Sequence, residues 1–348
     1  MSQLRRRSHR RLLALLLPAA ILAALLAAYK LLWQRGADPL VVYCAHDAVY
    51  SEQILRAFEL ETGIPVAIVF DTEATKSLGL VERLIREKDA PRCDVFWNNE
   101  LLGTLDLKDR GLLQPHYIWG HYRLPKQFCD PDYHWTGFAA RFRVWIVNTA
   151  KLAPTEEAIA KALEGDLSRV AIAKPIYGTT LTHYTVLWHH WGGDKLKAWH
   201  ADWRRRGVVE ARGNAHVKDL VADGTCDLGL TDTDDFFVAQ DAGKLVAMLP
   251  FRLDNGQTLC IPNTVCIING TRRFERAQKL VDYLVSPGCE KALADSAAHQ
   301  VPLVPDYTQV LSHDVAILAR WVKDGYALPC LGPARAECLA WLKSEYAR

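Results

Sequence analysis

The sequence of 348 residues predicts an α/β protein with a parallel sheet, and three observations lead to this fold class. Short apolar runs typical of strands alternate with amphipathic stretches of helical length. These runs are almost entirely apolar, as expected of strands covered on both faces. Polar clusters follow several of them, at the place where open α/β sheets bind ligands. With 50% hydrophobic and 24% charged residues, the chain is not disordered, and its length suits two or three domains.

The part of the chain after position 37 begins with three strand–helix pairs. The expected strands are 39–45, 65–70 and 93–98, and the expected helices are 51–63, 75–88 and 101–111. Gly63 and Gly111 end two of these helices, as glycine commonly does at a helix carboxyl terminus. This alternation indicates βαβ units.

Two longer strand-like segments, near 137–149 and 258–268, bracket the middle of the chain. Shorter strands are expected at 169–175, at 226–231 before a polar loop that carries the sequence TDTDD, and at 245–250. Helices dominate from position 272 to the end. The bracketed unit, residues 139–263, has the size of a whole domain.

Residues 1–37 differ in composition from the rest of the chain. They contain seven basic residues and no acid, and an arginine cluster precedes the apolar run 12–33. Such a segment is either a signal peptide or an uncleaved membrane anchor, and the remainder of the chain is then exported. The net charge of +2 thereby separates into a basic leader and a body with 35 basic and 40 acidic residues, a net −5.

Nine cysteines fit an exported protein only in part, because an odd number leaves at least one thiol unpaired. Cys330 and Cys338 could close a local disulfide. Cys260 and Cys266 fall in a strand pattern and are expected in the core. The absence of a CxxC motif excludes a zinc ribbon and a thioredoxin-type site.

Polar clusters at the ends of the expected strands supply the candidate ligand-binding residues. In the first part of the chain these are His46, Asp47, Thr72, Glu73, Asn98 and Asn99. In the middle of the chain they are Gly178, Thr179, Thr180, Asn214, Asp232, Asp234 and Asp235. Each cluster also has a simpler interpretation as a helix cap, a turn or a solvated loop.

Two of the clusters indicate the chemistry of a ligand. The segment 178–180, GTT at the start of a helix, has converging amides suited to an anion. Asp232, Asp234 and Asp235 lie within four residues, so their charges repel unless a cation or an amine compensates them.

The sequence contains no GxSxG, HExxH, Walker or GxGxxG motif, and no pair of acids stands out for acid–base catalysis. We therefore expect a protein that is not an enzyme. The mildly acidic body also argues against nucleic acid as a partner, because nucleic-acid binding requires a basic face.

The segment from Val41 to Glu100, with DTEATK at 71–76 and DVFWNNE at 94–100, resembles the amino-terminal lobe of periplasmic solute-binding proteins of the ferric-iron ABC-transporter family. The segments 171–183 and 217–235 resemble its second lobe, and 261–270 resembles the returning crossing strand. The resemblance extends to Pro302 and implies a type II periplasmic binding fold. Lobe 1 would comprise 38–138 and 264–348, and lobe 2 would comprise 139–263.

The resemblance also implies ligand positions. In ferric-binding members a His or Glu of the first lobe and two consecutive Tyr of the second hold the metal, while an anion occupies a helix start. By motif position His46 matches the His, and the segment 178–180 matches the anion seat. The Tyr pair falls at Asp234 and Asp235, which is a departure. His46, Asp234 and Asp235 are thus candidate ligands of Fe(III) or of another metal ion, and two carboxylates could equally bind an amine or a hydroxylated ligand.

We therefore expect a monomeric solute-binding receptor of an ABC importer, located in the periplasm or anchored to the inner membrane through the N-terminal helix. It would bind a metal ion of the iron type or a small anionic or polar solute between the lobes, and deliver it to an ABC permease. The alternatives are a sensory or partner-binding module that uses the same lobe closure without transport, and an enzyme on the same scaffold.

Overall fold

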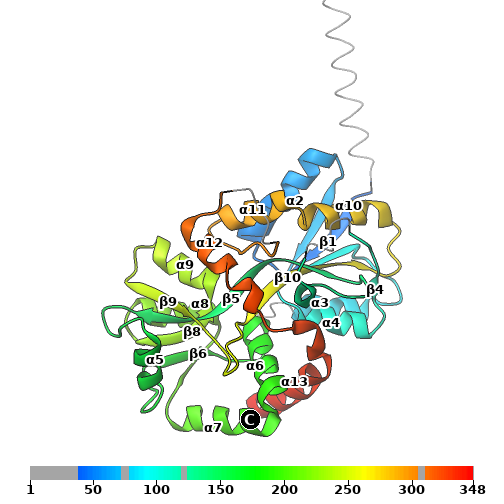
Figure 1. Cartoon of the computed structure of the whole chain (residues 1–348). Coiled ribbons are helices and arrows are strands. Elements are labelled where there is room, and N and C mark those ends of the chain that lie inside the picture. The colour runs from blue at the N-terminus through cyan, green and yellow to red at the C-terminus, as the bar shows by residue number, and fades with distance from the viewer. Residues whose placement is uncertain (1–37, 72–77, 119–123, 305–309, 348) are drawn as a thin grey trace, which may run out of the picture.

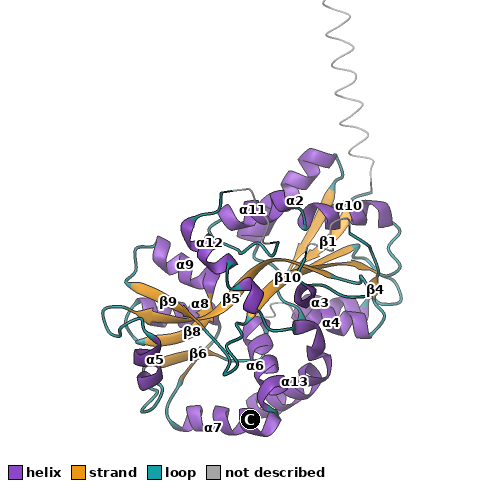
Figure 2. Cartoon of the chain, in the orientation of Figure 1, coloured by secondary structure: helices purple, strands orange, loops and turns teal. Residues whose placement is uncertain are grey.

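The computed structural model describes residues 38–71, 78–118, 124–304 and 310–347, which form two α/β lobes (Figure 1). Strands lie at the centre of each lobe and helices surround them (Figure 2). Among the described residues, no helix is long and apolar enough to cross a membrane. The expected leader, residues 1–37, lies outside the described residues.

The first lobe contains the three strand–helix pairs that the sequence predicts. Its elements are β1 (Leu40–Cys44), α2 (Ala48–Thr62), β2 (Val66–Phe70), α3 (Leu78–Arg86), β3 (Val95–Asn98), α4 (Leu102–Asp109), β4 (Leu113–Gln114), α10 (Phe274–Leu284) and α11 (Pro287–Asp295). Gly63 caps α2 in the left-handed conformation, with φ of 70°, as expected for a glycine after a helix. Ser286 caps the start of α11 by accepting a hydrogen bond from the amide of Cys289.

The second lobe repeats the alternation. Its elements are α5 (Glu156–Ala162), β6 (Val170–Ala173), α6 (Gly178–Trp191), α7 (Gly193–Arg205), β7 (Val209–Ala211), α8 (Asn214–Ala222), β8 (Leu228–Asp232), α9 (Thr233–Asp241) and β9 (Val246–Pro250). The sequence predicts a polar loop after β8, and this prediction is wrong, because TDTDD forms the end of β8 and the first turn of α9. Acidic residues favour the first turn of a helix, where their charge interacts with the helix dipole.

Two long strands, β5 (Thr136–Asn148) and β10 (Cys260–Ile268), join the lobes. The described strands form the order β2-β1-β3-β10-β5-β8-β6-β7, with β4 paired to β10 and β9 paired to β5. Strand β5 pairs with β10 through its first half and with β8 and β9 through its second half. The two segments that the sequence predicts as crossing strands therefore hold the lobes together.

The crossing strands are irregular where they pass between the lobes. Ala139 has a φ of 40°, which is uncommon for a residue other than glycine. On β10 the pairing register shifts between Pro262 and Asn263. The side-chain amide of Asn263 donates to the carbonyl of Ala139 and to Gln300, so side-chain hydrogen bonds hold the irregular region.

The C-terminal helices are α12 (His313–Ala319) and α13 (Gly332–Tyr346). Helix α13 packs against α6 of the second lobe and also against α4 of the first (Figure 1). Glu337 of α13 accepts a hydrogen bond from Trp188 of α6 at 3.1 Å. Arg335 of α13 donates to Asp106 of α4 at 2.8 Å. The C-terminal segment thus contacts both lobes.

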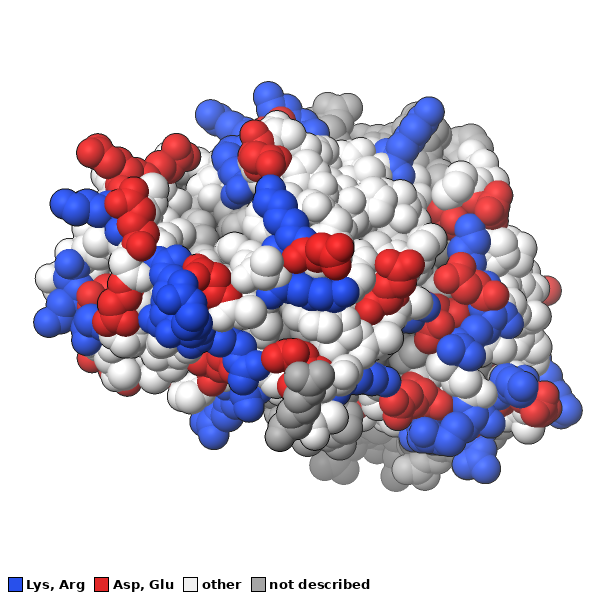
Figure 3. All heavy atoms as spheres, turned by 90° about the horizontal axis from the view of Figure 1, so that it is seen from below, with Lys and Arg blue, Asp and Glu red and all other residues white. Residues whose placement is uncertain are grey.

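The face of the molecule in Figure 3 carries basic and acidic side chains interspersed with one another. It has no continuous stripe of one charge, so this face does not create a long-range field of one sign.

All nine cysteines lie among the described residues as free thiols, and only Cys330 is exposed. The disulfide considered between Cys330 and Cys338 is therefore wrong, whereas the core positions expected for Cys260 and Cys266 are confirmed. We expect thiol titration of the denatured protein to detect nine reactive groups without prior reduction. Reductant should leave the melting temperature unchanged. Fewer than nine thiols would contradict this prediction.

Candidate functional site

A cavity of about 350 Å³ lies between the lobes and receives side chains from both. The first lobe contributes Asp47, Tyr50 and Asn99. The crossing strand β5 contributes Arg141. The second lobe contributes Ala173, Lys174, Tyr177, Gly178, Thr179, Thr180, Arg212, Gly213, Asn214, Ala215, Lys218, Asp232, Asp234, Asp235 and Val238.

The second-lobe wall consists mainly of helix starts. Strands β6 and β7 are parallel, as are β6 and β8, and after each of the three strands the chain turns into a helix, α6, α8 and α9 respectively. Their amino termini therefore gather at one edge of the sheet. Tyr177 and Asp232, which precede α6 and α9, make no side-chain capping hydrogen bond, and Gly213, which precedes α8, has no side chain that could make one. At the starts of α6 and α8 the uncapped first-turn amides and the helix dipole together favour an anion, whereas in α9 the amide of Asp235 already donates to Asp234 Oδ1 at 3.1 Å.

Gly178 adapts the start of α6 to the cavity. Its φ is 60°, a conformation that side chains with a Cβ rarely adopt, and no atom lies within 4 Å of the position that a Cβ would take. The site requires glycine here for its backbone conformation.

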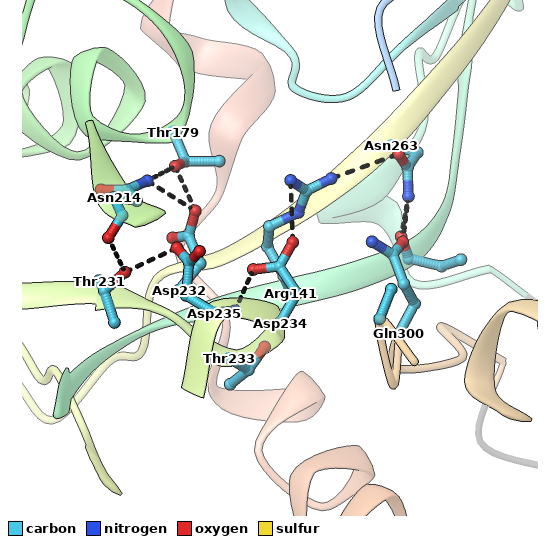
Figure 4. Close-up of polar contacts among 12 residues, drawn as sticks. Arg141, Thr179, Asn214, Thr231, Asp232, Thr233, Asp234, Asp235, Asn263 and Gln300 are labelled. Atoms are coloured by element: carbon cyan, nitrogen blue, oxygen red, sulfur yellow. Dashed lines mark hydrogen bonds and ion pairs between the residues drawn. The ribbon is translucent and has the colours of Figure 1, made fainter. Parts of the chain in front are cut away.

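Asp232 lies in a network of buried hydrogen bonds (Figure 4). One carboxylate oxygen accepts from Arg143 Nη1 at 2.7 Å. The other accepts from Asn214 Nδ2 at 2.9 Å and from the hydroxyl of Thr179. Asp232 therefore has both oxygens occupied and connects the starts of α6, α8 and α9.

Arg143 lies behind Asp232 and is fully buried. Besides Asp232, it donates to Asn214 Oδ1 at 3.1 Å, to the Leu230 carbonyl at 3.3 Å and to His183 Nδ1 at 3.4 Å. Burial and the charge of Arg143 hold the pKa of His183 well below its usual value, so this ring stays neutral and can accept. Arg143 therefore compensates Asp232 and positions the helix starts.

The other two acids of the cluster are less completely satisfied. Asp234 pairs with Arg141 Nη1 at 3.4 Å, and Asp235 accepts from the Thr231 hydroxyl at 2.7 Å. Burial raises the pKa of both carboxyls, and repulsion from Asp234 and Asp232 contributes to raising that of Asp235 to about 8. At neutral pH Asp235 is therefore mostly protonated and can donate as well as accept a hydrogen bond.

The structure brings nine of the predicted site residues to the cavity: Asp47, Asn99, Gly178, Thr179, Thr180, Asn214, Asp232, Asp234 and Asp235. Thr72 and Glu73 lie outside the described residues. His46 and Asn98 do not line the cavity. The buried ring of His46 packs against Tyr50 and Trp97, at centroid distances of 5.9 and 5.4 Å, and Asn98 donates to Glu100 at 3.1 Å.

The prediction from sequence missed the basic residues of the site. Arg141 and Arg143 lie within the strand segment ARFRV, where two charges interrupt an apolar run, and this interruption was a usable signal. Lys174, Arg212 and Lys218 lie directly beside the predicted polar clusters. Their inclusion changes an apparently acidic site into one of mixed charge.

Among the described residues, two groups of three side chains have ligand atoms within 4.8 Å of one another and could hold a metal ion. One is the cluster of Asp232, Asp234 and Asp235. The other is formed by Asp130, Asp132 and His134, where the Lys108 amine already contacts both carboxylates. In the first group Asp232 accepts from three donors. Both oxygens of Asp234 also have partners, Arg141 at 3.4 Å and the amide of Asp235 at 3.1 Å, so a cation would have to compete with these contacts.

Two lobes joined by crossing strands, with an interlobe cavity lined by helix starts, define a solute-binding receptor. The family model of the bacterial extracellular solute-binding protein matches residues 40–296, and this chain belongs to that family. Iron uptake protein A1 of Synechocystis sp. is 25% identical over 301 residues, covering 82% of this chain and 80% of the relative.

Solved structures confirm the fold. Iron-bound HitA from Pseudomonas aeruginosa matches with a TM-score of 0.74 and 20% identity, over 88% of this chain and 99% of that one. AfuA from Actinobacillus pleuropneumoniae with fructose-6-phosphate bound matches with a TM-score of 0.68 and 17% identity, over 88% and 98%. The resemblance to the ferric-iron-type solute-binding proteins and the two-lobed fold predicted from it are thereby confirmed.

Proposed function

We propose that this chain is the periplasmic receptor of an ABC importer for a small hydroxylated organic anion, and that residues 1–37 either direct its export or anchor it to the inner membrane. The solute would lie between Asp47 and Asn99 of the first lobe and the helix starts of the second. Lobe closure around it would create the form that a permease recognises.

The distribution of charge in the cavity supports an anionic solute. Lys174, Arg212 and Lys218 line the cavity together with the starts of α6 and α8. Amides at a helix start and basic side chains both favour a carboxylate or a phosphate. Asp235 and Asp47 would bind hydroxyl groups, for which carboxyl groups are common partners.

The ion pairs of the acidic cluster are the main support for an organic solute rather than a bare cation. Arg143 compensates Asp232 at 2.7 Å, and Arg141 lies 3.4 Å from Asp234. With Asp235 mostly protonated at neutral pH, the cluster has little uncompensated negative charge with which to attract a bare cation. A neutral hydroxyl group fits this environment better.

Fe(III) bound together with an anion is the second candidate. A relative is named an iron uptake protein, and a structural neighbour holds iron. Asp234 and Asp235 would supply hard oxygen ligands to the metal, while the helix starts would bind the anion. This candidate requires Asp235 to lose its proton and the metal to compete with Arg141.

We expect citrate or glucose 6-phosphate to raise the melting temperature of the protein. A ligand at 100 times its Kd stabilises by about 2.7 kcal/mol, which is several degrees for a protein of this size. Inorganic phosphate, Fe(III) citrate and Fe(III) nitrilotriacetate form the comparison series. If both iron complexes stabilise the protein and citrate alone does not, the solute is Fe(III) and the proposal of an organic anion is wrong. No stabilisation by any of these compounds would contradict the proposed function.

A further inference from the structure

Two arginines on β5 differ in how well their hydrogen-bond donors are satisfied. Arg143 has four acceptors between 2.7 and 3.4 Å. Arg141 lies two residues earlier on the same strand, so its side chain leaves the same face of the sheet. Figure 4 shows its guanidinium between Asp234 and Asn263.

Arg141 is 5% exposed, yet its contacts are long and few. Nη1 lies 3.4 Å from Asp234 Oδ2, and Nη2 lies 3.5 Å from Asn263 Oδ1. Nε is buried and has no hydrogen-bond partner within the part of the chain that the structure describes. A guanidinium carries five N–H donors, so most of the hydrogen-bonding capacity of Arg141 is unused.

Leaving a buried charged donor unsatisfied costs more than leaving a neutral one, and buried charges are normally paired closely. Arg143 shows that this strand can satisfy an arginine fully. Arg141 differs because it lines the interlobe cavity, where an acceptor can enter with the solute. The planar fork of a guanidinium matches a carboxylate or a phosphate, which accepts two parallel hydrogen bonds.

We propose that Arg141 is a specificity-determining residue that binds an anionic group of the solute, in addition to the group held at the helix starts. The inference rests on the proposed function and narrows it to solutes with at least two acceptor groups. One of these groups would bind Arg141 on β5, and the other would bind the helix starts. A dicarboxylate, a tricarboxylate or a phosphorylated acid meets this requirement.

The residues around Arg141 would allow a solute anion to replace Asp234 as its partner. Burial raises the pKa of Asp234, so a solute anion that takes over Arg141 meets a carboxyl group that can bind a proton and donate to it. Asn263, the other neighbour of Arg141, lies on β10 and also accepts from Trp97 at 3.3 Å. A solute bound to Arg141 would therefore contact β5 directly and β10 through Asn263.

The test compares Arg141→Gln and Arg141→Lys with the wild-type protein, using calorimetric titration with citrate and the melting temperature without ligand. We expect Arg141→Gln to weaken citrate binding at least about 30-fold and Arg141→Lys to weaken it less, since Lys keeps the charge without the fork. Without ligand, Arg141→Gln should lower the melting temperature less than Arg143→Gln does, because Arg141 contacts Asp234 at 3.4 Å whereas Arg143 contacts Asp232 at 2.7 Å, and Asp234, whose pKa is raised, can bind a proton instead. Arg169→Gln, at an exposed pair with Asp227, is the control for removing an arginine.

Unchanged citrate binding by Arg141→Gln would overturn the inference. A loss of melting temperature as large as that of Arg143→Gln would also overturn it, because Arg141 would then be structural. If the wild-type protein binds neither citrate nor glucose 6-phosphate nor Fe(III) citrate, the proposed function fails. The ligand-free comparison of Arg141→Gln with Arg143→Gln is independent of that result, and equal losses of melting temperature would overturn the inference about Arg141 in that case too.

Discussion

Replacing Arg143 by Gln should destabilise the protein by about 3–5 kcal/mol, because the change leaves Asp232 buried without its compensating charge. Arg143 is fully buried and lies 2.7 Å from Asp232. It also donates to Asn214, so the start of α8 loses a second hydrogen bond. We expect the melting temperature to fall by roughly 5–10 °C, measured by differential scanning calorimetry.

Arg169→Gln is a matched control for this prediction. Arg169 also pairs with an aspartate, Asp227, at 2.6 Å, but both side chains are partly exposed to solvent. Exposed pairs contribute about 0–1 kcal/mol, so this variant should melt close to the wild type. If both variants lost the same amount of melting temperature, burial would not increase the contribution of the Arg143–Asp232 pair to stability. The positioning role assigned to Arg143 would then be wrong.

The fold was predictable because its determinants are local. The apolar runs at β1, β2 and β3 and the helix-ending Gly63 are readable from a few residues each, and each forms the expected element. Both crossing strands were also recognisable, since they are longer than the other strands. The boundaries of the lobes stay a prediction, because α13 contacts both of them.

The site was predictable only in part, because its charge balance depends on residues far apart in the sequence. The polar clusters at 178–180 and 232–235 follow their strands directly, and the parallel order of those strands brings them together. The pairing of Asp232 with Arg143 joins residues 89 positions apart. No local spacing reveals such a contact, so the acidic cluster looked uncompensated from sequence alone.

The TDTDD segment illustrates the same limit. Its three acids suggested a polar loop whose negative charge requires a cation, but the start of a helix explains the same composition. Asp232 precedes α9, and Asp234 and Asp235 occupy its first turn, where the helix dipole favours negative charge. The difference matters for function, because a rigid helix start holds the two carboxyl groups at a fixed place in the cavity wall.

Replacing Asp235 by Asn should stabilise the protein, increasingly so as the pH rises from about 4 to about 8. The pKa of Asp235 is raised from its ordinary value of 3.8 to about 8 by burial and by the neighbouring acids. Between these two values the folded state binds more protons than the unfolded state, so wild-type stability falls as pH rises. Asn cannot ionise and still offers an oxygen to the Thr231 hydroxyl. At pH 8 we expect a gain of at least about 1 kcal/mol, measured by denaturant unfolding across the pH range.

The same titration separates the two candidate solutes. Above pH 8 the ionised Asp235 adds negative charge beside Asp234 and Asp232, so the wild-type protein should bind citrate more weakly, whereas Fe(III) would gain a ligand. Citrate binding by Asp235→Asn should not show this loss. Asp241→Asn, at the exposed end of the same helix, removes a carboxylate outside the cluster and should follow the wild type. If stability of wild type and Asp235→Asn changes in parallel from pH 4 to 8, the carboxyl of Asp235 does not carry a raised pKa. The protonated acid then no longer explains why the site would prefer a hydroxyl group over a cation.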